Sequence, residues 1–498
     1  MKSCSNRWLR CGVLIFPVQI LGSLVAVLFL GATLLQAQTF TVLYNFPSLG
    51  DGANPTNPGI IAQGRDGNLY STTIGGCGGF NLSGEVFRVS PLGKFKTVNC
   101  LSSAPNLGGP YSGVSMGTDG KFYGTSIGGD YYGAVWKVSS GGKSTAYSPF
   151  TAEPNLFGPL APPVLGMDGS FYGTTASGGS GCTYSSGGCG GIYKITAAGK
   201  GYKVLETLAQ TNGSNPDAPL VLGTDGNFYG TASLGGTSTG PGFGGGGVIF
   251  KITPAGTYSV LYNLCTMKSC LDGEFPYDGL VEGTDGNFYG TANGGGTRTY
   301  ASAFTGGVIF QVSPAGSYKV IYNFCSQTNC DDGANPLGGL VQASDGNFYG
   351  TTQVGGAKNY GTIFQLTPAG EYTVLYNFDN TTGAYPDGTL VQDTNGILYG
   401  DTHNGGSSND GVFFSLNLGL PAFAKLVTWW GKPGGKIGIL GQGFKGTTSV
   451  TFNGAAATFK TTGDTFITAT VPAGATSGYV KVVTKTGTLT SNQIFQVQ

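Results

Sequence analysis

One histidine limits the chemistry that this chain could perform. His403, in the stretch GDTHNGG, is the only histidine among 498 residues, so a Ser-His-Asp triad would have to use it. A lone histidine in a glycine-rich loop is more often solvated than catalytic. Metal sites built on several imidazoles are excluded by count, and the chain contains neither a D-x-D-x-D-G calcium loop nor a G-x-x-x-x-G-K nucleotide loop. We therefore expect no catalytic residue, no cofactor and no bound metal.

Carboxylates offer a second route to catalysis. A glycoside hydrolase needs two acids about 5–9.5 Å apart. Acids recur in most of the loops that lead into the apolar LV-type segments, but no two of them form a unique pair: Asp51, Glu153, Asp217, Asp272, Glu274, Asp331, Asp332 and Asp387. A secreted carbohydrate-active hydrolase or lyase that uses two of these acids stays open as an alternative.

Aromatic side chains in the glycine-rich loops suggest ligand binding instead, because flat rings can contact the C–H groups of sugars. The candidate residues are Tyr131, Tyr132, Tyr184, Phe243, Tyr300, Phe304 and Tyr360. Lysine and arginine are nearly absent from these loops, with Arg298 and Lys358 as exceptions, which argues against phosphate or sulfated polymers. A neutral or weakly cationic glycan is therefore the expected ligand, unless the rings only pack on their own loops.

Eight cysteines follow the first 37 residues, and their spacing predicts disulfides rather than a metal site. A zinc site would need cysteine pairs that converge in space, usually with histidine support, and the chain has one histidine. Two pairs share the same spacing, a third pair is local, and two cysteines are left over. The predicted disulfides are Cys265–Cys270, Cys325–Cys330, Cys182–Cys189 and Cys77–Cys100.

A repeated hairpin must position these loops. The stretch VEGTDGNFYGT at 281–291 predicts an apolar strand, a turn and an aromatic-rich strand, and Asp285-Gly286 predicts a two-residue turn with positive φ angles. The same turn recurs at residues 66, 119, 168, 225, 285, 345 and 395. A period of about fifty residues is typical of a propeller or another repeat array.

Each repeat contains four short strands, as GLVEG, NFYGTA, GVIFQVS and SYKVIYNF show within residues 279–324. The third strand has an aromatic residue at the same position in all seven copies, which predicts packing between repeats: Phe87, Trp136, Tyr193, Phe250, Phe310, Phe364 and Phe414. The array begins with a lone fourth strand at 39–46 and ends without one. A closed seven-bladed β-propeller explains this offset, since the first strand would complete the last blade and leave no free sheet edge.

These units resemble the GloVer tandem repeats of exported bacterial proteins. The resemblance rests on the pattern LV-x-x-x-DGNFYGT…GG…G-x-IF-x-(L/V/I)-(T/S)-P-A-G-x-Y-x-VLYNF, which is cleanest at 220–378 and covers about residues 39–416. It implies a secreted or cell-surface protein with a variable C-terminal module, and it implies little about function.

The C-terminal segment alternates apolar and polar residues without the repeated hairpin. It resembles an IPT/TIG domain through ILGQGF, VTFNGAAA, VPAGATSGYVKV and SNQIFQV, which implies an Ig-like β-sandwich. We therefore expect an all-β chain with a signal segment at 1–37, a propeller at 38–418 and an Ig-like domain at 419–498.

The first 37 residues predict export. Lys2, Arg7 and Arg10 precede an apolar run from Gly12 to Leu35, and cleavage is expected after Ala37. The run is also long enough to act as a retained anchor, because a membrane span takes about 20 residues. The rest of the chain is slightly acidic and has no basic run, so nucleic acid is not an expected partner.

These features favour a non-catalytic exported or cell-surface binding or scaffold protein. In a propeller the short turns would lie on one side, and the long, variable loops with all eight cysteines on the other, where binding is expected. The expected partner is an extracellular glycan or a surface protein, and the expected state is a monomer that is secreted, periplasmic or on the surface of a bacterium. The alternative is a carbohydrate-active hydrolase or lyase with paired acids at the channel mouth.

Overall fold

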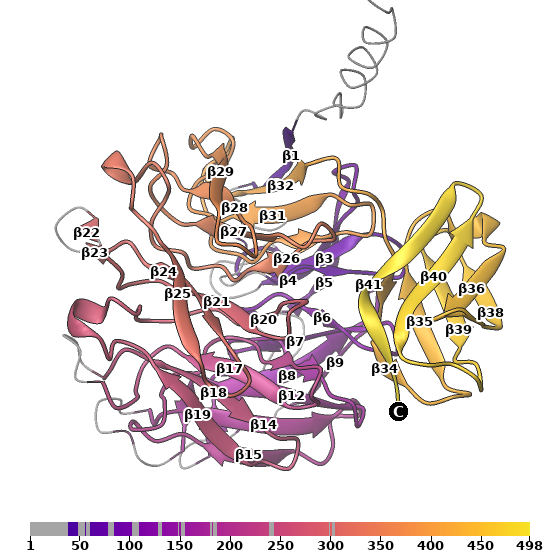
Figure 1. Cartoon of the computed structure of the whole chain (residues 1–498), viewed down its shortest axis with the longest axis horizontal. Coiled ribbons are helices and arrows are strands. Elements are labelled where there is room, and N and C mark those ends of the chain that lie inside the picture. Colours follow the sequence, from indigo (N-terminus) through magenta and orange to yellow (C-terminus); the bar gives the residue numbers. More distant parts are fainter. Residues whose placement is uncertain are drawn as a thin grey trace, which may run out of the picture. The chain divides into compact units, whose positions relative to one another are not determined.

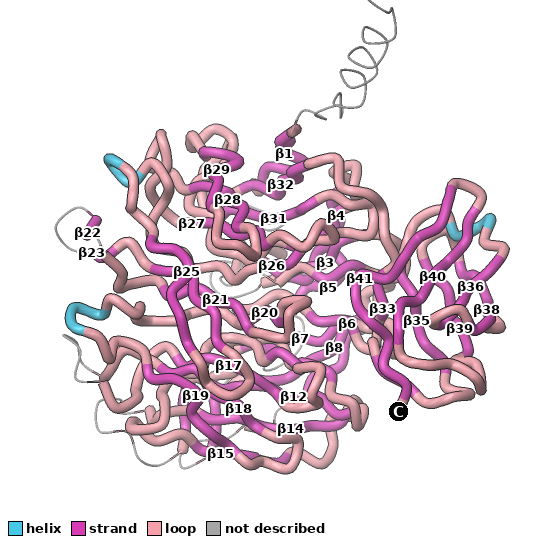
Figure 2. Tube along the Cα trace, viewed as in Figure 1, coloured by secondary structure: helices cyan, strands magenta, loops and turns pink. Residues whose placement is uncertain are grey.

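The computed structural model describes residues 38–47, 55, 60–77, 84–101, 109–127, 132–147, 149–150, 155–179, 182, 187–238, 244–297, 299–300 and 304–498. The expected signal segment at 1–37 lies outside these residues. The described part of the chain is almost entirely strands, turns and loops (Figures 1 and 2). Its named helices are short 3-10 turns, η2 (Lys268–Cys270), η3 (Thr328–Cys330) and η4 (Phe444–Gly446), and none of its helices could cross a membrane.

Residues 39–417, as far as they are described, contain seven four-stranded antiparallel sheets, which we call sheets 1–7. Sheet 1 contains β2 (Ala62–Gln63), β3 (Leu69–Thr73), β4 (Glu85–Val89) and β5 (Phe95–Cys100), and sheet 2 contains β6 (Ser115–Met116), β7 (Phe122–Ser126), β8 (Ala134–Val138) and β9 (Ser144–Tyr147). Sheet 3 contains β11 (Val164–Leu165), β12 (Ser170–Thr175), β14 (Gly191–Thr196) and β15 (Lys203–Thr207), and sheet 4 contains β16 (Val221–Leu222), β17 (Phe228–Ala232), β18 (Val248–Ile252) and β19 (Tyr258–Asn263).

Sheets 5–7 repeat the same order. Sheet 5 contains β20 (Val281–Glu282), β21 (Phe288–Ala292), β24 (Val308–Val312) and β25 (Tyr318–Asn323). Sheet 6 contains β26 (Val341–Gln342), β27 (Phe348–Thr352), β28 (Thr362–Leu366) and β29 (Tyr372–Asn377). Sheet 7 contains β30 (Val391–Gln392), β31 (Leu398–Thr402), β32 (Val412–Asn417) and β1 (Thr39–Asn45). Two further strand pairs lie in loops, β10 (Leu156–Phe157) with β13 (Ser177–Gly178), and β22 (Thr299–Tyr300) with β23 (Phe304–Thr305).

The repeated turn is longer than the two-residue turn that Asp285-Gly286 predicted. The Gly286 N–H donates to the carbonyl of Gly283, and the Gly283 N–H donates to the carbonyl of Asn287, so residues 284–286 form the turn. Gly286 has a φ of 76°, whereas Asp285 is not among the residues with positive φ. The Asp285 carboxylate instead accepts hydrogen bonds from the Asn287 N–H at 3.1 Å and the Tyr289 hydroxyl at 2.9 Å. Its role is to hold the turn and the next strand together.

Aromatic packing joins each sheet to the next, as the sequence predicted. All seven aromatic residues of the third strand are fully buried. The glycine of the NFYGT stretch makes room for them: a Cβ atom at Gly290 would lie 2.7 Å from the Phe310 ring. In sheets 1–5 the tyrosine of the same stretch packs against a phenylalanine of the following sheet, with ring centroids 3.8 Å apart for Tyr229 and Phe288.

Strand β1 pairs with β32 in antiparallel register from Thr39↔Asn417 to Asn45↔Val412, so this predicted pairing is confirmed. β1 also connects sheet 7 to both of its neighbours. Phe40 stacks on Tyr376 of sheet 6 at 3.8 Å, and Tyr44 stacks on Phe95 of sheet 1 at 4.3 Å. Sheet 7 therefore contacts both sheet 6 and sheet 1 through β1.

The end of the chain forms two more sheets, which we call the C-terminal sheets. One contains β33 (Lys425–Leu426), β35 (Lys436–Leu440), β39 (Phe466–Thr470) and β38 (Phe459–Thr462). The other contains β34 (Trp430–Gly431), β41 (Gly487–Val497), β40 (Gly478–Thr484), β36 (Ser449–Phe452) and β37 (Ala455–Ala456). Residues of both sheets share one buried apolar cluster, so the two sheets pack face to face.

The C-terminal sheets contact the short turns of sheets 1, 4 and 7. The Thr465 hydroxyl donates to the Arg65 carbonyl at 2.7 Å, and the Arg65 guanidinium lies 4.5 Å from the Phe466 ring centroid. The Gln442 amide donates to the Thr394 hydroxyl at 3.0 Å. On the other side, the Gln496 amide donates to the Thr224 carbonyl at 3.3 Å. The C-terminal sheets thus occupy part of the short-turn side.

Candidate functional site

The long loops opposite the short turns carry the cysteines, and all four predicted disulfides are confirmed. The Cα atoms are 5.8 Å apart in Cys77–Cys100, 5.2 Å in Cys182–Cys189, and 4.0 Å in both Cys265–Cys270 and Cys325–Cys330. Three of the bridges close loops with sequence separations of 5 to 7, and Cys77–Cys100 spans 23 residues within one repeat, so none of them ties distant sheets together.

Replacing Cys265 and Cys270 together with serine should lower the free energy of unfolding by about 2 kcal/mol, because a short loop loses its covalent closure. The same double substitution at Cys325 and Cys330 should have an equal effect, since both bridges have a sequence separation of 5. Urea denaturation of the oxidised protein measures the difference. Free thiols at these positions in the purified wild-type protein would contradict the prediction.

Two of the loop acids that the sequence offered for catalysis are structural. Asp272 is fully buried, and its carboxylate accepts hydrogen bonds from the Tyr262 hydroxyl at 2.9 Å and from the Thr266 N–H at 2.9 Å. Asp332 makes the equivalent contacts one repeat later, with Tyr322 at 2.7 Å. Both carboxylates shape the disulfide-closed loops and have no free oxygen toward solvent.

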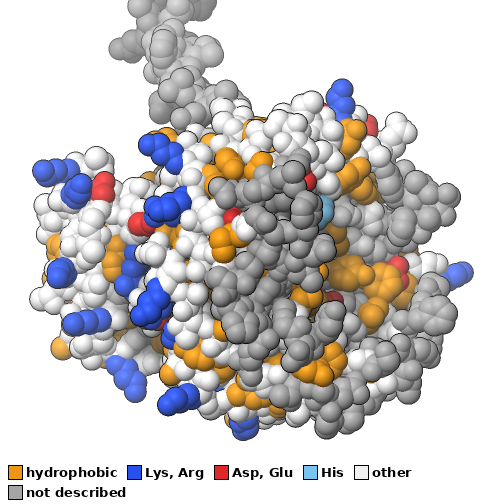
Figure 3. All heavy atoms as spheres, turned by 180° about the vertical axis from the view of Figure 1, so that it is seen from behind, with side chains coloured by type: hydrophobic (Ala, Val, Ile, Leu, Met, Phe, Trp, Pro, Cys, Tyr) orange, Lys and Arg blue, Asp and Glu red, His pale blue; other side chains and the backbone are white. Residues whose placement is uncertain are grey.

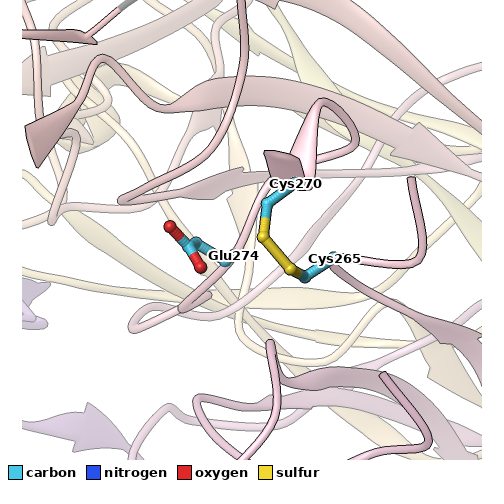
Figure 4. Close-up of side chains that lie close together, drawn as sticks. All are labelled: Cys265, Cys270 and Glu274. Carbon is cyan, nitrogen blue, oxygen red and sulfur yellow. A yellow bond between two sulfur atoms is a disulfide. The ribbon is translucent and has the colours of Figure 1, made fainter. Parts of the chain in front are cut away.

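Glu274 lies beside the Cys265–Cys270 disulfide (Figure 4). Burial and the negative charge of Asp272 raise the pKa of Glu274. The three side chains are close enough to share a metal ion, but both sulfurs are bonded to each other and supply no thiolate. This group therefore does not fit a metal site in the oxidised protein.

Asp278, which the sequence did not single out, connects the loops of three sheets. It is 3% exposed and precedes sheet 5. Its carboxylate accepts hydrogen bonds from the Gly279 N–H, from the Gly339 N–H before sheet 6 and from the Thr389 hydroxyl before sheet 7. Burial raises the pKa of Asp278 above its ordinary value, and these hydrogen bonds offset part of that rise. The variable loops contain no repeated pattern that could have revealed this contact.

His403, the histidine that the sequence singled out, lies in a cluster of titratable side chains with Asp387 and Asp401. The His403 Nδ1 atom lies 3.8 Å from Asp387 Oδ2, and the two side chains are 35% and 4% exposed. Burial and the charge of Asp401 raise the pKa of Asp387, and burial raises the pKa of Asp401 to about 7. Burial lowers the pKa of His403, which contacts the backbone of Pro55 near sheet 1. Within the described part of the chain, neither carboxylate oxygen of Asp401 accepts a hydrogen bond, and the Oδ1 atom of Asp387 accepts none either.

Asp401 replaces a threonine that the other repeats use to join neighbouring sheets. In sheets 2–6 this threonine hydroxyl donates to a carbonyl in the loop before the next sheet, as Thr231 does to Asp278 at 2.9 Å and Thr291 does to Gly338 at 3.2 Å. An ionised carboxylate cannot donate such a bond. The cluster therefore stands where sheet 7 meets sheet 1, and its two acids are enclosed rather than open to a substrate.

Two of the aromatic candidates are described with their side chains, and both contact other rings. Tyr132 packs edge-on against Phe157 at 6.0 Å, and Tyr360 lies 6.1 Å from Tyr385. Each is partly buried against an apolar cluster. Figure 3 shows hydrophobic side chains exposed in patches on one face.

The other aromatic candidates cannot be placed by their side chains. Tyr131, Tyr184 and Phe243 lie outside the described residues, as do the acids Asp51 and Glu153. Tyr300 and Phe304 face each other in the backbone register of β22 and β23. Among the described candidates, the structure does not bring Tyr132 and Tyr360 together, since they belong to the clusters of different sheets.

The described sheets define an all-β protein with propeller-like four-stranded units. The model of the Gloeobacter/Verrucomicrobia repeat matches residues 127–329 and 242–466, more than half of the chain, so the chain belongs to this repeat family. The resemblance to GloVer repeats is thereby confirmed, although the matches leave out the first repeat and the first two strands of the second, and they extend beyond residue 416.

Several solved structures are similar to this chain at low sequence identity. One is a fungal alcohol oxidase of the AA5 family in complex with copper. Its match covers 91% of this chain and 100% of the oxidase chain, with 15% identity and a TM-score of 0.49. The GH74 enzyme of Niastella koreensis covers 92% of this chain with 75% of its own length, at 14% identity and a TM-score of 0.48. None of the curated proteins matches. These similarities carry nothing about the chemistry of this chain.

Proposed function

We propose that this chain is an exported, non-catalytic binding or scaffold protein that uses the long-loop side of a closed seven-bladed β-propeller. The pairing of β1 with β32 and the contacts of sheet 7 with sheet 1 support a closed ring. The two C-terminal sheets would form an Ig-like domain of the IPT/TIG type, for which their shared apolar cluster is the support. Four disulfides support export, since such bonds persist in oxidising compartments.

The observation that carries a binding role is the contrast between the two sides of the sheets. The short turns are alike and are partly occupied by the C-terminal sheets, whereas the long loops differ from repeat to repeat, and three of them are closed by local disulfides. Rigid scaffolds with variable, braced loops commonly bind ligands through those loops. Binding rather than catalysis is favoured because Asp272, Asp332, Asp387 and Asp401 are all buried.

A neutral glycan on the cell surface or in the medium is the proposed ligand, and a surface protein is the other proposed partner. The aromatic rings of the long loops would contact sugar faces, and seven similar units would bind weakly but at several points. The proposed state is a monomer, with the N-terminal segment either removed after Ala37 or kept as an anchor.

Replacing Tyr131, Tyr184, Tyr300 and Tyr360 with alanine should reduce retention on an array of immobilised neutral glycans by at least tenfold. The reason is that each ring would lose one apolar contact with a sugar at a multivalent surface. The unfolding temperature should change by only a few degrees. Leu92, which is 87% exposed in a short turn, supplies a matched alanine control that should leave retention unchanged.

Two other outcomes would contradict this proposal. A clear loss of stability with unchanged retention would show that the four rings pack their own loops. Release of shortened glycan from the array by the wild-type protein would favour the hydrolase or lyase alternative, and products resolved by mass spectrometry would identify it.

A further inference from the structure

A cavity of about 350 Å³ lies on the short-turn side, between sheets 5 and 6 and the C-terminal sheets. Glu282 and Thr284 of sheet 5 line one wall, and Tyr479 and Ile494 of β40 and β41 line the other. Trp429 lines it as well and packs against the apolar clusters of both the C-terminal sheets and sheet 4. The volume is within the range of small-molecule sites, which is about 300–1,000 Å³.

Large apolar side chains are left exposed in this cavity. Tyr479 is 46% exposed and Ile494 is 50% exposed, and both are among the few large hydrophobic residues exposed in the described part of the chain. Each lies on a strand whose neighbouring residues bury their side chains in the core, such as Val480 and Phe495. An exposed aromatic and aliphatic pair that lines a cavity is typical of a binding surface.

The polar groups of the cavity fall into two sets. The first set is held by hydrogen bonds within the protein: the Glu282 carboxylate accepts from the N–H and the hydroxyl of Thr224, at 2.9 and 2.6 Å, and the Gln342 Oε1 accepts from the Thr284 N–H at 2.9 Å. The second set is free, since the side-chain amides of Asn492 and Gln493 contact no partner among the described residues. These amides can each donate and accept hydrogen bonds with a ligand.

The charge of the lining restricts the ligand. No lysine, arginine or histidine is among the described residues that line the cavity, so an anion would find no counter-charge from them. Glu282 is the one acid among the described residues of the lining, and both of its oxygens already accept hydrogen bonds from Thr224, which makes this carboxylate a poorer ligand for a cation. We propose that this cavity binds one unit of a neutral saccharide, with the Tyr479 ring and Ile494 against its apolar face and the two amides on its hydroxyl groups. This site is separate from the long-loop side and does not depend on it.

The test is isothermal titration calorimetry of the purified full chain with maltotetraose, cellotetraose and laminaritetraose. At least one of these neutral probes should bind, and Tyr479→Ala should weaken that binding at least tenfold. Gln493→Ala should weaken it several-fold. Val483→Ala is the matched control, because Val483 is a 37% exposed residue of the same strand outside the cavity and should leave binding unchanged. Trigalacturonate, an anionic probe, should not bind.

The outcomes separate this site from the long-loop side. The fourfold tyrosine variant of the long loops should keep its affinity for the soluble probe, and Tyr479→Ala should keep its retention on the glycan array. Binding that survives Tyr479→Ala and Gln493→Ala together, equal binding of trigalacturonate, or no binding of any neutral probe would overturn the proposal. Near-ultraviolet circular dichroism confirms that each variant is folded before its result is used.

Discussion

Replacing Phe46 with alanine should lower the free energy of unfolding by about 3–5 kcal/mol, as for other fully buried phenylalanines. Phe46 directly follows β1, is fully buried and lies in the apolar cluster that sheets 1 and 7 share. Its ring is 5.6 Å from that of Phe87 in sheet 1. The cavity left by this substitution would open at the place where the first and last sheets meet, so we expect aggregation to increase as well.

Two controls make this prediction specific. Phe324→Ala, at the equivalent position after β25, should cost a similar amount because Phe324 is also fully buried. Leu92→Ala should change stability by less than about 0.5 kcal/mol, as expected for an exposed residue. Chemical denaturation of the three variants measures these differences, and an effect of Phe46→Ala no larger than that of Leu92→Ala would show that β1 does not close the array.

Replacing Asp401 with threonine should stabilise the protein by about 2–4 kcal/mol at pH 8 and change little at pH 4. Burial raises the pKa of Asp401 from 3.8 to about 7, so the folded state keeps a proton that the unfolded chain loses. The protonated Asp401 carboxyl makes its full contribution to the free energy of unfolding below about pH 4, and this contribution is lost as the pH rises toward 7. A threonine removes the buried charge and restores a hydroxyl donor like that of Thr351 in sheet 6.

Asp387 is the titratable group that interacts with Asp401, and His403 in turn lies 3.8 Å from Asp387. Since the charge of Asp401 helps to raise the pKa of Asp387, the substitution should also bring that pKa closer to its ordinary value. Thr351→Asp is the reciprocal control and should introduce a similar loss of stability between pH 4 and pH 8. Thermal unfolding measured across this pH range would refute the assignment if Asp401→Thr left the pH dependence unchanged.

The fold could be predicted to the level of individual strands because its signals are local and repeated. The NFYGT stretch combines a turn, a glycine that admits the Phe310 ring and a tyrosine that packs on the next sheet, and each of these contacts is present in the structure. The one local error concerned the turn at Asp285-Gly286. A short loop fits more than one backbone conformation, and the contact of Asp285 with Tyr289 decides which one forms.

The candidate site could be predicted only in part. The disulfides were predictable because three of the four cysteine pairs are close in sequence and the fourth pair was left over. Asp401 could have been found by comparing the repeats, because it replaces a threonine that the other copies share. Asp278 carried no such signal, since its loop differs from the loops of the other repeats.

The sequence by itself determined the number of repeats, the order of strands within each one, the pairing of β1 and the local disulfides. Hydrogen bonding and aromatic packing in this chain recur every fifty residues or so, and a recurring contact leaves a recurring pattern. Only the tertiary structure decided which unique residues meet: Asp278 with Thr389, His403 with Asp387, and Thr465 with Arg65, 400 residues earlier. The same holds for the cavity beside Tyr479. Such contacts occur once, between loops whose positions depend on the packing of all seven sheets, and no local pattern records them.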